Sequence, residues 1–204
     1  GRKRHLLLAA FVALAPNVAS ASPADCIKIE SDLDRLACYD RALGRTPTPI
    51  VAPAGGDWMM TTEKNALTDQ TDVFLGVRSE EIVNCGWNHG DHIILQVRCM
   101  ENRTSLILAT GCPMTSSEYN SYGDVTYRLD DEPARTVSMN ESTNNRSLGL
   151  WSGGRSIPVL KQMLGKSRMV VKMTPYGENP FTATFNISGL DKSIEPLQQA
   201  CGWK

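Results

Sequence analysis

Four side chains that can ligate a metal lie close together in the segment CGWNHGDH. They are Cys85, His89, Asp91 and His92. Zinc accepts sulfur, nitrogen and oxygen ligands of these kinds. The same residues are also typical of a polar turn that leads into the strand HIILQVRC, and alternation along a strand would place Asp91 and His92 on opposite faces. We therefore expect a turn here and no metal site.

A second group of reactive side chains is acidic. Asp130, Asp131 and Glu132 follow one another in RLDDEP. Paired carboxylates can cleave a glycosidic bond by acid–base chemistry, so this group is compatible with an enzyme that acts on the cell wall. Pro133 follows directly, however, and acids before a proline are typical of a solvated turn that ends a strand. We prefer the turn and expect no catalytic residue.

Nucleophilic catalysis has little support in the sequence. Apart from His5 near the N-terminus, the histidines are His89 and His92, which share one loop and so offer a single place for a general base. No serine stands in the Gly-x-Ser-x-Gly pattern of hydrolases, and GLWSGGRS lacks the spacing of a phosphate-binding loop. The sequence therefore predicts a protein that is not an enzyme and that holds no cofactor.

The N-terminus has the order of a secretory signal. Basic residues at positions 2–4 precede an apolar run from Leu6 to Ala15, and small residues follow at positions 19–21. The run is shorter than the roughly 20 residues of a membrane-spanning helix. We expect a signal peptide over residues 1–21 and a mature chain without a membrane span. Its removal would change the net charge from −1 to −4, which offers no basic field for nucleic acid.

The cysteines point to an oxidising compartment. An even number of cysteines in an exported chain indicates disulfides. The six cysteines all follow the expected cleavage point and are Cys26, Cys38, Cys85, Cys99, Cys112 and Cys201. Fifteen pairings of six cysteines are possible. Beyond the first two, our first choice is Cys99 with Cys201 and Cys85 with Cys112, and the spacing leaves the alternatives open.

Cys26 and Cys38 are the pair that lies closest in the N-terminal segment. An unbroken helix would hold them about 18 Å apart, beyond the reach of a disulfide. The bond therefore requires a segment that folds back, and Ser31 begins a helix-capping signal at that point. We expect a helical N-terminal module over residues 22–45, followed by a Pro/Gly-rich linker over residues 46–57.

The remainder of the chain, residues 58–204, is dominated by alternation of period two, which is typical of strands with one buried face. In HIILQVRC, Ile93, Leu95 and Val97 share a face, and a hairpin turn is expected at residues 100–102. Further strands are expected at residues 71–77, 105–108, 125–129, 135–139, 169–173 and 182–187, and helices at residues 156–164 and 190–200.

These elements predict the fold class. Strands follow strands without crossover helices, which favours a mainly β fold: an antiparallel β-sandwich with peripheral helices, preceded by the short disulfide-linked helical segment. Large aromatic side chains usually lie in the core of such a domain. We expect this of most of the four tryptophans, Trp58, Trp87, Trp151 and Trp203.

Several segments carry a resemblance to one family. In order along the chain they are RLACYDRALG, Trp58, LTDQTDVFL, LQVRCMENRTSLIL, VTYRLDDEP, IPVLKQMLG, MTPYGENPFTATFNISGL and IEPLQQACGW. Together they resemble the bacterial type VI secretion-associated proteins of the VasI/TagO type, over nearly the whole mature chain. Cys85, Cys112 and the histidine-containing loop are additions to the usual pattern of that family.

The resemblance implies a periplasmic accessory protein of the type VI secretion apparatus, a contractile device that delivers effectors into neighbouring cells. It supplies no catalytic residue. We expect a protein that binds a periplasmic or envelope partner, such as a component of the secretion system, through a sheet edge or a loop face. The N-terminal module would be a second contact. The alternative is a peptidoglycan-directed enzyme or enzyme inhibitor in the cell envelope.

Overall fold

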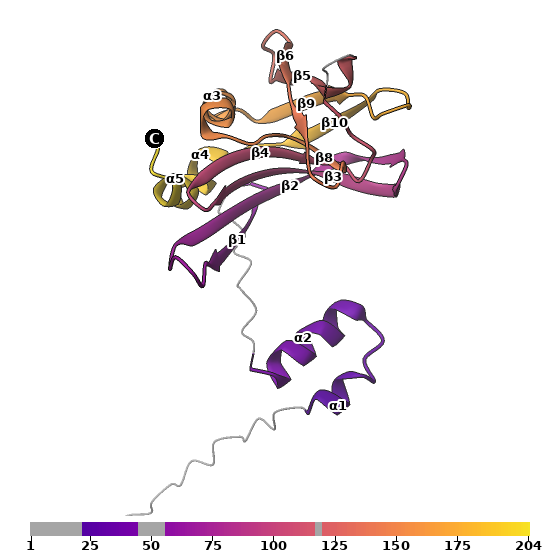
Figure 1. The fold of residues 1–204 in the computed structure, drawn as a ribbon, viewed down its shortest axis with the longest axis vertical. Helices are drawn as coiled ribbons and strands as arrows, with labels where there is room; N and C mark the ends of the chain where they lie inside the picture. The colour runs from indigo at the N-terminus through magenta and orange to yellow at the C-terminus, as the bar shows by residue number, and fades with distance from the viewer. Residues whose placement is uncertain (1–21, 45–55, 117–119) are drawn as a thin grey trace, which may run out of the picture. The chain divides into compact units, whose positions relative to one another are not determined.

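The computed structural model describes residues 22–44, 56–116 and 120–204 of the chain. The expected signal peptide lies outside the described residues, as does most of the expected linker. The chain divides into two compact units, one up to Pro47 and one from Thr48 onward. Within the described ranges, the first unit is helical and the second is built on two β-sheets (Figure 1).

The first unit is a pair of short helices, α1 (Pro23–Cys26) and α2 (Asp32–Ala42). The disulfide Cys26–Cys38 joins them, as predicted, with its Cα atoms 5.5 Å apart. Arg35 secures the connection between the helices, because its Nη1 donates a hydrogen bond to the carbonyl oxygen of Ile29 at 2.8 Å. Both cysteines are buried. So small a unit has little hydrophobic core, and the covalent bond provides the stability that burial cannot.

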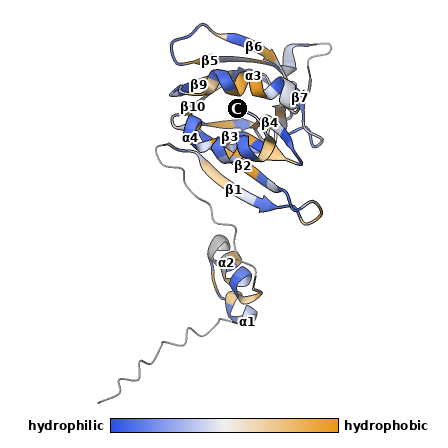
Figure 2. Cartoon of the chain, turned by 90° about the vertical axis from the view of Figure 1, so that its left-hand side faces the viewer, coloured by the Kyte–Doolittle hydropathy of each residue, from blue (hydrophilic) through white to orange (hydrophobic). Residues whose placement is uncertain are grey.

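The second unit is an antiparallel β-sandwich, which confirms the predicted fold class. Its strands are β1 (Met59–Lys64), β2 (Thr71–Cys85), β3 (Asn88–Met100), β4 (Arg103–Ala109), β5 (Asp124–Leu129), β6 (Arg135–Ser138), β7 (Asn140–Glu141), β8 (Ser147–Leu150), β9 (Arg168–Met173) and β10 (Phe181–Asn186). One sheet has the order β1-β2-β3-β4-β8-β7 and the other the order β10-β9-β5-β6. Figure 2 shows the two sheets as separate layers.

The long hairpin of β2 and β3 is the centre of the larger sheet. On β3, Ile93, Leu95 and Val97 are fully buried between the sheets, as their alternation predicts. The turn from β3 to β4 is a two-residue turn in which Glu101 and Asn102 have φ values of 52° and 58°. Two consecutive positive φ values give the tight hairpin turn that matches the twist of the strands.

Helices lie at one end of the sandwich (Figure 1). The helix α3 (Gly153–Met163) packs against β4 and β8, and α5 (Glu195–Cys201) packs against β2 and β3. The 3-10 turn Ser121–Gly123 directly precedes β5, and the short helix α4 (Leu190–Ser193) directly precedes α5. No helix in the described part of the chain is long and apolar enough to cross a membrane.

Several elements differ from the sequence-based expectation. The edge strands β1 and β7 and the strand β8 between β4 and β7 were not predicted. β7 and β8 are short runs, and β1 has the burial pattern of a strand that is open on both sides. The expected helix at residues 190–200 is two helices, since Pro196 starts a new helix at its first turn. The strand expected at residues 71–77 continues to Cys85 through a bulge between Arg78 and Ile82.

Candidate functional site

The segment CGWNHGDH forms the tip of the β2–β3 hairpin. The sulfur of Cys85 is bonded to that of Cys112, so it is not a thiolate ligand. His89 is exposed, and Nδ1 of His92 lies 2.7 Å from the carbonyl oxygen of Ser79. Among the described residues, no three His, Cys, Asp or Glu side chains are grouped so that they could hold a metal ion.

The acidic segment after β5 contacts the start of the neighbouring strand β9. Oδ1 of Asp130 accepts hydrogen bonds from the backbone N–H groups of Ser167 and Arg168, at 3.0 and 2.9 Å. Glu132 forms an ion pair with Lys166 at 2.7 Å, and this hydrogen bond raises the pKa of Lys166. Two of the three acids therefore have structural contacts at the start of β9.

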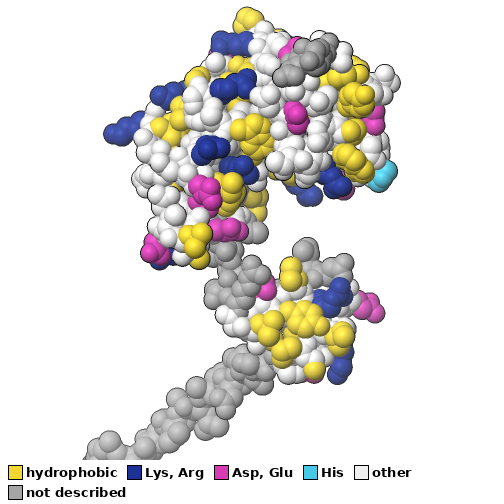
Figure 3. Space-filling view, in the orientation of Figure 1, with side chains coloured by type: hydrophobic (Ala, Val, Ile, Leu, Met, Phe, Trp, Pro, Cys, Tyr) yellow, Lys and Arg dark blue, Asp and Glu magenta, His cyan; other side chains and the backbone are white. Residues whose placement is uncertain are grey.

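The β2–β3 and β9–β10 hairpins end at the same end of the sandwich (Figure 1), and each carries an exposed aromatic side chain there. Trp87 is 54% exposed and Tyr176 is 61% exposed. The guanidinium carbon of Arg146 lies 4.8 Å from the centre of the Trp87 ring. The rings of Tyr122 and Tyr176 are 5.3 Å apart. We call Trp87, Tyr122, Arg146 and Tyr176 the Trp87 surface; Figure 3 shows hydrophobic side chains gathered at this end.

Contacts between three loops hold the Trp87 surface in place. The disulfide Cys85–Cys112 joins the β2–β3 tip to the segment after β4. The backbone N–H of Tyr176 donates to the carbonyl oxygen of Pro113 at 2.8 Å, which adds the β9–β10 hairpin. Only glycine fits at position 86, because its φ is +51° and a Cβ there would lie 2.5 Å from the Pro113 ring.

This arrangement is suited to binding. Tryptophan, tyrosine and arginine are the residue types that dominate the energy of protein interfaces. Trp87 presents a large apolar ring, and the guanidinium of Arg146 fixes that ring from one side by a cation–π contact. Because rigid aromatic side chains lose little entropy when they are covered, the surface can contribute affinity at low cost.

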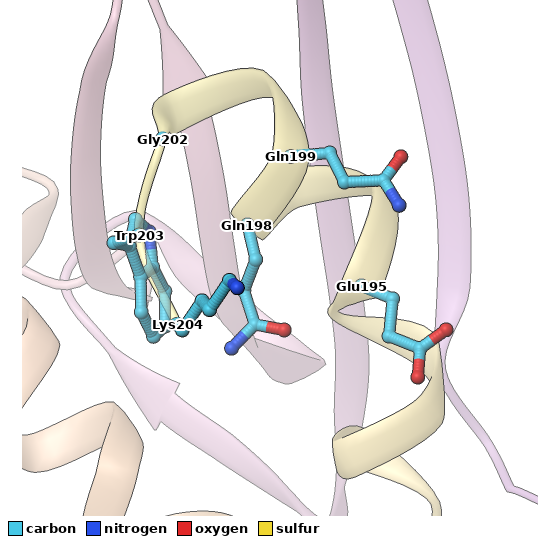
Figure 4. Close-up of a pocket in the computed structure, with 6 residues that line it drawn as sticks. All are labelled: Glu195, Gln198, Gln199, Gly202, Trp203 and Lys204. Atoms are coloured by element: carbon cyan, nitrogen blue, oxygen red, sulfur yellow. The ribbon is translucent and has the colours of Figure 1, made fainter.

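A separate hollow of about 490 Å³ lies at the C-terminal helix α5 (Figure 4). Nε1 of Trp203 donates to the hydroxyl of Thr104 at 2.9 Å, and the disulfide Cys99–Cys201 fixes the end of the helix to β3. Figure 4 shows Gln198, Trp203 and Lys204 among the residues that line this hollow. The lining thus comes from one helix and the segment after it.

The first unit exposes apolar side chains of its own. Ile27, Leu36 and Leu43 are 71%, 57% and 72% exposed. Three large apolar side chains are thus exposed on a unit of only two short helices. An exposed apolar surface on a small unit is typical of a contact site for another protein.

The Trp87 surface was not predicted from the sequence. Most tryptophans were expected in the core, and Trp58 is indeed fully buried, with its Nε1 donating to the carbonyl oxygen of Ile187 at 3.2 Å. Trp87 is exposed instead, and Trp151 and Trp203 are half-buried. One signal was available for Trp87, since a tryptophan inside a polar turn cannot alternate with a buried strand face.

Comparisons with known proteins place the chain in a family. The model of the family described as type VI secretion system VasI, EvfG matches residues 25–203. No curated protein sequence matches the chain. The crystal structure of invasion-associated protein B from Bartonella henselae is similar at a TM-score of 0.41 and 11% identity, over 76% of this chain and 97% of that one. Because the family match spans most of both units, the chain belongs to the VasI family of type VI secretion proteins.

Proposed function

We propose that this protein is a periplasmic, non-catalytic accessory protein of type VI secretion that binds another protein of the secretion system or the envelope. Membership of the VasI family supports the association with secretion. Three disulfides support a place outside the reducing cytoplasm, because such bonds persist in oxidising compartments. Residues 1–21 would act as the signal peptide that takes the chain there.

The Trp87 surface is the observation that carries the binding role. Its aromatic rings are exposed, and a disulfide and backbone hydrogen bonds hold the loops that present them. A surface that is already ordered before a partner arrives loses less conformational entropy on binding. The partner would therefore cover Trp87 and Tyr176 with apolar side chains of its own.

The first unit provides a second contact in this proposal. Its exposed residues Ile27, Leu36 and Leu43 would bind the same partner or a neighbouring one. Two binding units on one chain raise the apparent affinity, because the second binding event becomes intramolecular. The protein would then act as an adaptor that holds its partner at two points.

Replacement of Trp87 tests the proposal. A strain that lacks the protein would be complemented with wild type, with W87A or with L67A as a matched control. Leu67 is 95% exposed in the turn between β1 and β2 and lies outside the Trp87 surface. We expect W87A to lower cross-linking to secretion-system proteins by about tenfold or more, and to reduce effector delivery into neighbouring cells.

The L67A variant should behave as wild type in both assays. Thermal unfolding would check the fold of W87A, whose side chain is exposed and should contribute little to stability. Equal cross-linking and delivery by W87A and wild type would show that the Trp87 surface does not bind the partner. Detection of the mature protein in the cytoplasm would contradict the periplasmic part of the proposal.

A further inference from the structure

Two adjoining hollows lie on the larger sheet at the end of β3 opposite the Trp87 surface. Their volumes are about 120 and 380 Å³, and both are lined by Arg98, Arg103 and Trp151. Arg98 alternates on β3 with the buried Val97 and Cys99, so its side chain is on the outer face of the sheet. We call this place the Trp151 pocket.

The wall of the Trp151 pocket is fixed. The indole ring lies over Gly149, where a Cβ would come within 2.8 Å of the ring. Nε1 of Trp151 donates a hydrogen bond to the carbonyl oxygen of Asn140 at 2.9 Å, and its own carbonyl oxygen accepts one from the hydroxyl of Ser105 at 3.0 Å. Both ends of the residue are therefore held, and the ring has a defined position before any ligand binds.

The two arginines beside this wall lack anionic partners. The guanidinium carbon of Arg98 lies 5.4 Å from the centre of the Trp151 ring, and its Nε is shielded from solvent without an acceptor. Within the described residues, neither Arg98 nor Arg103 has a carboxylate or a hydrogen-bond acceptor for its side chain. Burial, with the like charge of Arg103, lowers the pKa of Arg98. A guanidinium N–H that is shielded from water without an acceptor, beside an aromatic wall, favours an anionic ligand.

We propose that the Trp151 pocket binds a carboxylate of an acidic peptide segment, with Arg98 and Arg103 as its hydrogen-bond donors. A planar guanidinium matches a planar carboxylate in geometry. Glu101 and Glu141 also line the hollows, and Oε2 of Glu141 is buried without a hydrogen-bond donor. Their charge opposes any anion, and it opposes a doubly charged phosphate more than a singly charged carboxylate. The face of Trp151 provides an apolar contact for the chain that carries the carboxylate.

The Trp151 pocket is a different site from the Trp87 surface and would bind a different class of ligand. Binding here can be measured with short peptides and needs no secretion component. A carboxylate of this kind can come from an acidic side chain or from the C-terminus of a partner segment. The test therefore needs one probe for each source and a neutral probe of the same shape.

Titration followed by NMR tests the proposal on the mature, oxidised protein. The probes are N-acetyl-Gly-Glu-Gly-amide, N-acetyl-Gly-Gly-Gly with a free carboxyl end, and the neutral N-acetyl-Gly-Gln-Gly-amide. We expect at least one of the two carboxylate peptides to shift the Nε–H signal of Arg98 and the Nε1–H signal of Trp151 in a saturable way. The peptide that acts at lower concentration identifies the source, and the neutral peptide should shift neither signal.

Variants test whether peptide binding depends on these two arginines or on positive charge in general. R98Q and R103Q should each weaken peptide binding by about tenfold or more. R98K keeps the charge without the planar fork, and should bind with an intermediate affinity. R128Q is the matched control, since Arg128 is an exposed arginine on the smaller sheet and should bind as wild type. Arg103 is exposed, so R103Q remains informative even if R98Q fails to fold.

Three outcomes would overturn the proposal. The first is equal binding of the neutral and the carboxylate peptides. The second is tighter binding of inorganic phosphate than of either carboxylate peptide, which would assign the pocket to a different anion. The third is an equal loss of binding in R128Q and R103Q. W87A should bind the peptides as wild type does, so a failure at the Trp87 surface and a failure at this pocket can be distinguished.

Discussion

Gly149 sets the position of the Trp151 ring. A Cβ at this position would lie 2.8–3.2 Å from three atoms of the indole, closer than carbon atoms pack in proteins. We expect Gly149→Ala to displace the ring and to lower the free energy of unfolding by about 1–3 kcal/mol. Urea unfolding followed by tryptophan fluorescence measures both effects.

Gly154 provides the control for this substitution. It lies in the first turn of α3, with nothing within 4 Å of the position that a Cβ would occupy. Gly154→Ala should leave stability unchanged or raise it by up to about 1 kcal/mol, since alanine favours helix. If G149A were as stable as G154A and kept the native fluorescence, the ring would not be confined by Gly149.

Glu81 links the two sheets through a single carboxylate. Its oxygens accept hydrogen bonds from the backbone N–H and the hydroxyl of Thr184 on β10, both at 2.7 Å. Partial burial acts to raise the pKa of Glu81, but these hydrogen bonds, one from its own backbone and the charge of Arg168 outweigh it and lower the pKa. The ionised form is therefore the one that the fold prefers.

The lowered pKa predicts a loss of stability in acid. A carboxyl group whose pKa is lower in the folded state than in the unfolded state contributes to the stability of the fold. This contribution is complete above the unfolded pKa and is lost as the pH falls through the folded pKa. We expect Glu81→Gln to be less stable than wild type at pH 7. The difference should shrink as the pH falls below the unfolded pKa of about 4 and then through the lower pKa of the folded state. Denaturant unfolding of both proteins at pH 7 and pH 3 measures this difference in the free energy of unfolding.

A difference between E81Q and wild type that stayed constant with pH would contradict this assignment. E80Q is the matched control, because Glu80 is an exposed neighbour on the same strand. Its substitution should leave the pH dependence of unfolding close to that of wild type.

At the scale of elements, the disulfides contribute unequally to stability. Cys99–Cys201 closes a loop with a sequence separation of 102 and fixes α5 to β3, whereas Cys26–Cys38 spans 12 residues inside the first unit. In the chain-entropy account, a loop of about 100 residues stabilises by roughly 4–5 kcal/mol. We expect C99A/C201A to lower the free energy of unfolding of the second unit by about that amount.

Tryptophan fluorescence reports on this unfolding selectively, because all four tryptophans lie in the second unit. C26A/C38A is the matched control: it removes a disulfide from the other unit and should leave the fluorescence-detected midpoint unchanged. A similar drop in both double variants would mean that the two units unfold together.

Much of the sandwich was predictable, because a buried strand face leaves its alternation in the sequence. Ile93, Leu95 and Val97 show this on β3. Edge strands such as β1 were missed because neither of their faces is fully covered, so no alternation is imposed. The short spacing of Cys26 and Cys38 singled out their bond, whereas spacing alone could not choose among the remaining pairings.

The two proposed binding sites were not predicted from the sequence, for a different reason. Trp87, Arg146 and Tyr176 come from three separate connections, and only the tertiary fold brings them to one end. The same holds for Arg98 and Trp151, which are joined across β4. Motifs consist of residues that are near in sequence, so they single out the polar tip and the acidic turn. Within these two segments, Cys85, Asp130 and Glu132 have structural contacts.

For the whole molecule, the decisive property is the oxidation state of its sulfur atoms. If the chain is exported as we propose, a thiol-alkylating reagent added to intact cells should label none of the six cysteines of the mature protein. A version without residues 1–21 should stay in the cytoplasm and be labelled. Mass spectrometry of the two proteins, with and without prior reduction, counts the labelled cysteines.

Prior reduction should make all six cysteines of the exported protein available. Labelling of the exported protein without reduction would contradict its oxidised state. Complete protection of the version without residues 1–21 would show that the bonds form without export.

The bond between Cys85 and Cys112 sets an order of events. In a newly made chain that is still reduced, the hairpin tip with Trp87 and the segment with Pro113 have no covalent brace. The brace forms only after the chain meets an oxidant. If the chain is exported as we propose, the Trp87 surface is therefore completed after export and not at synthesis. Formation of this disulfide would thus delay binding of the partner until both proteins are on the same side of the membrane.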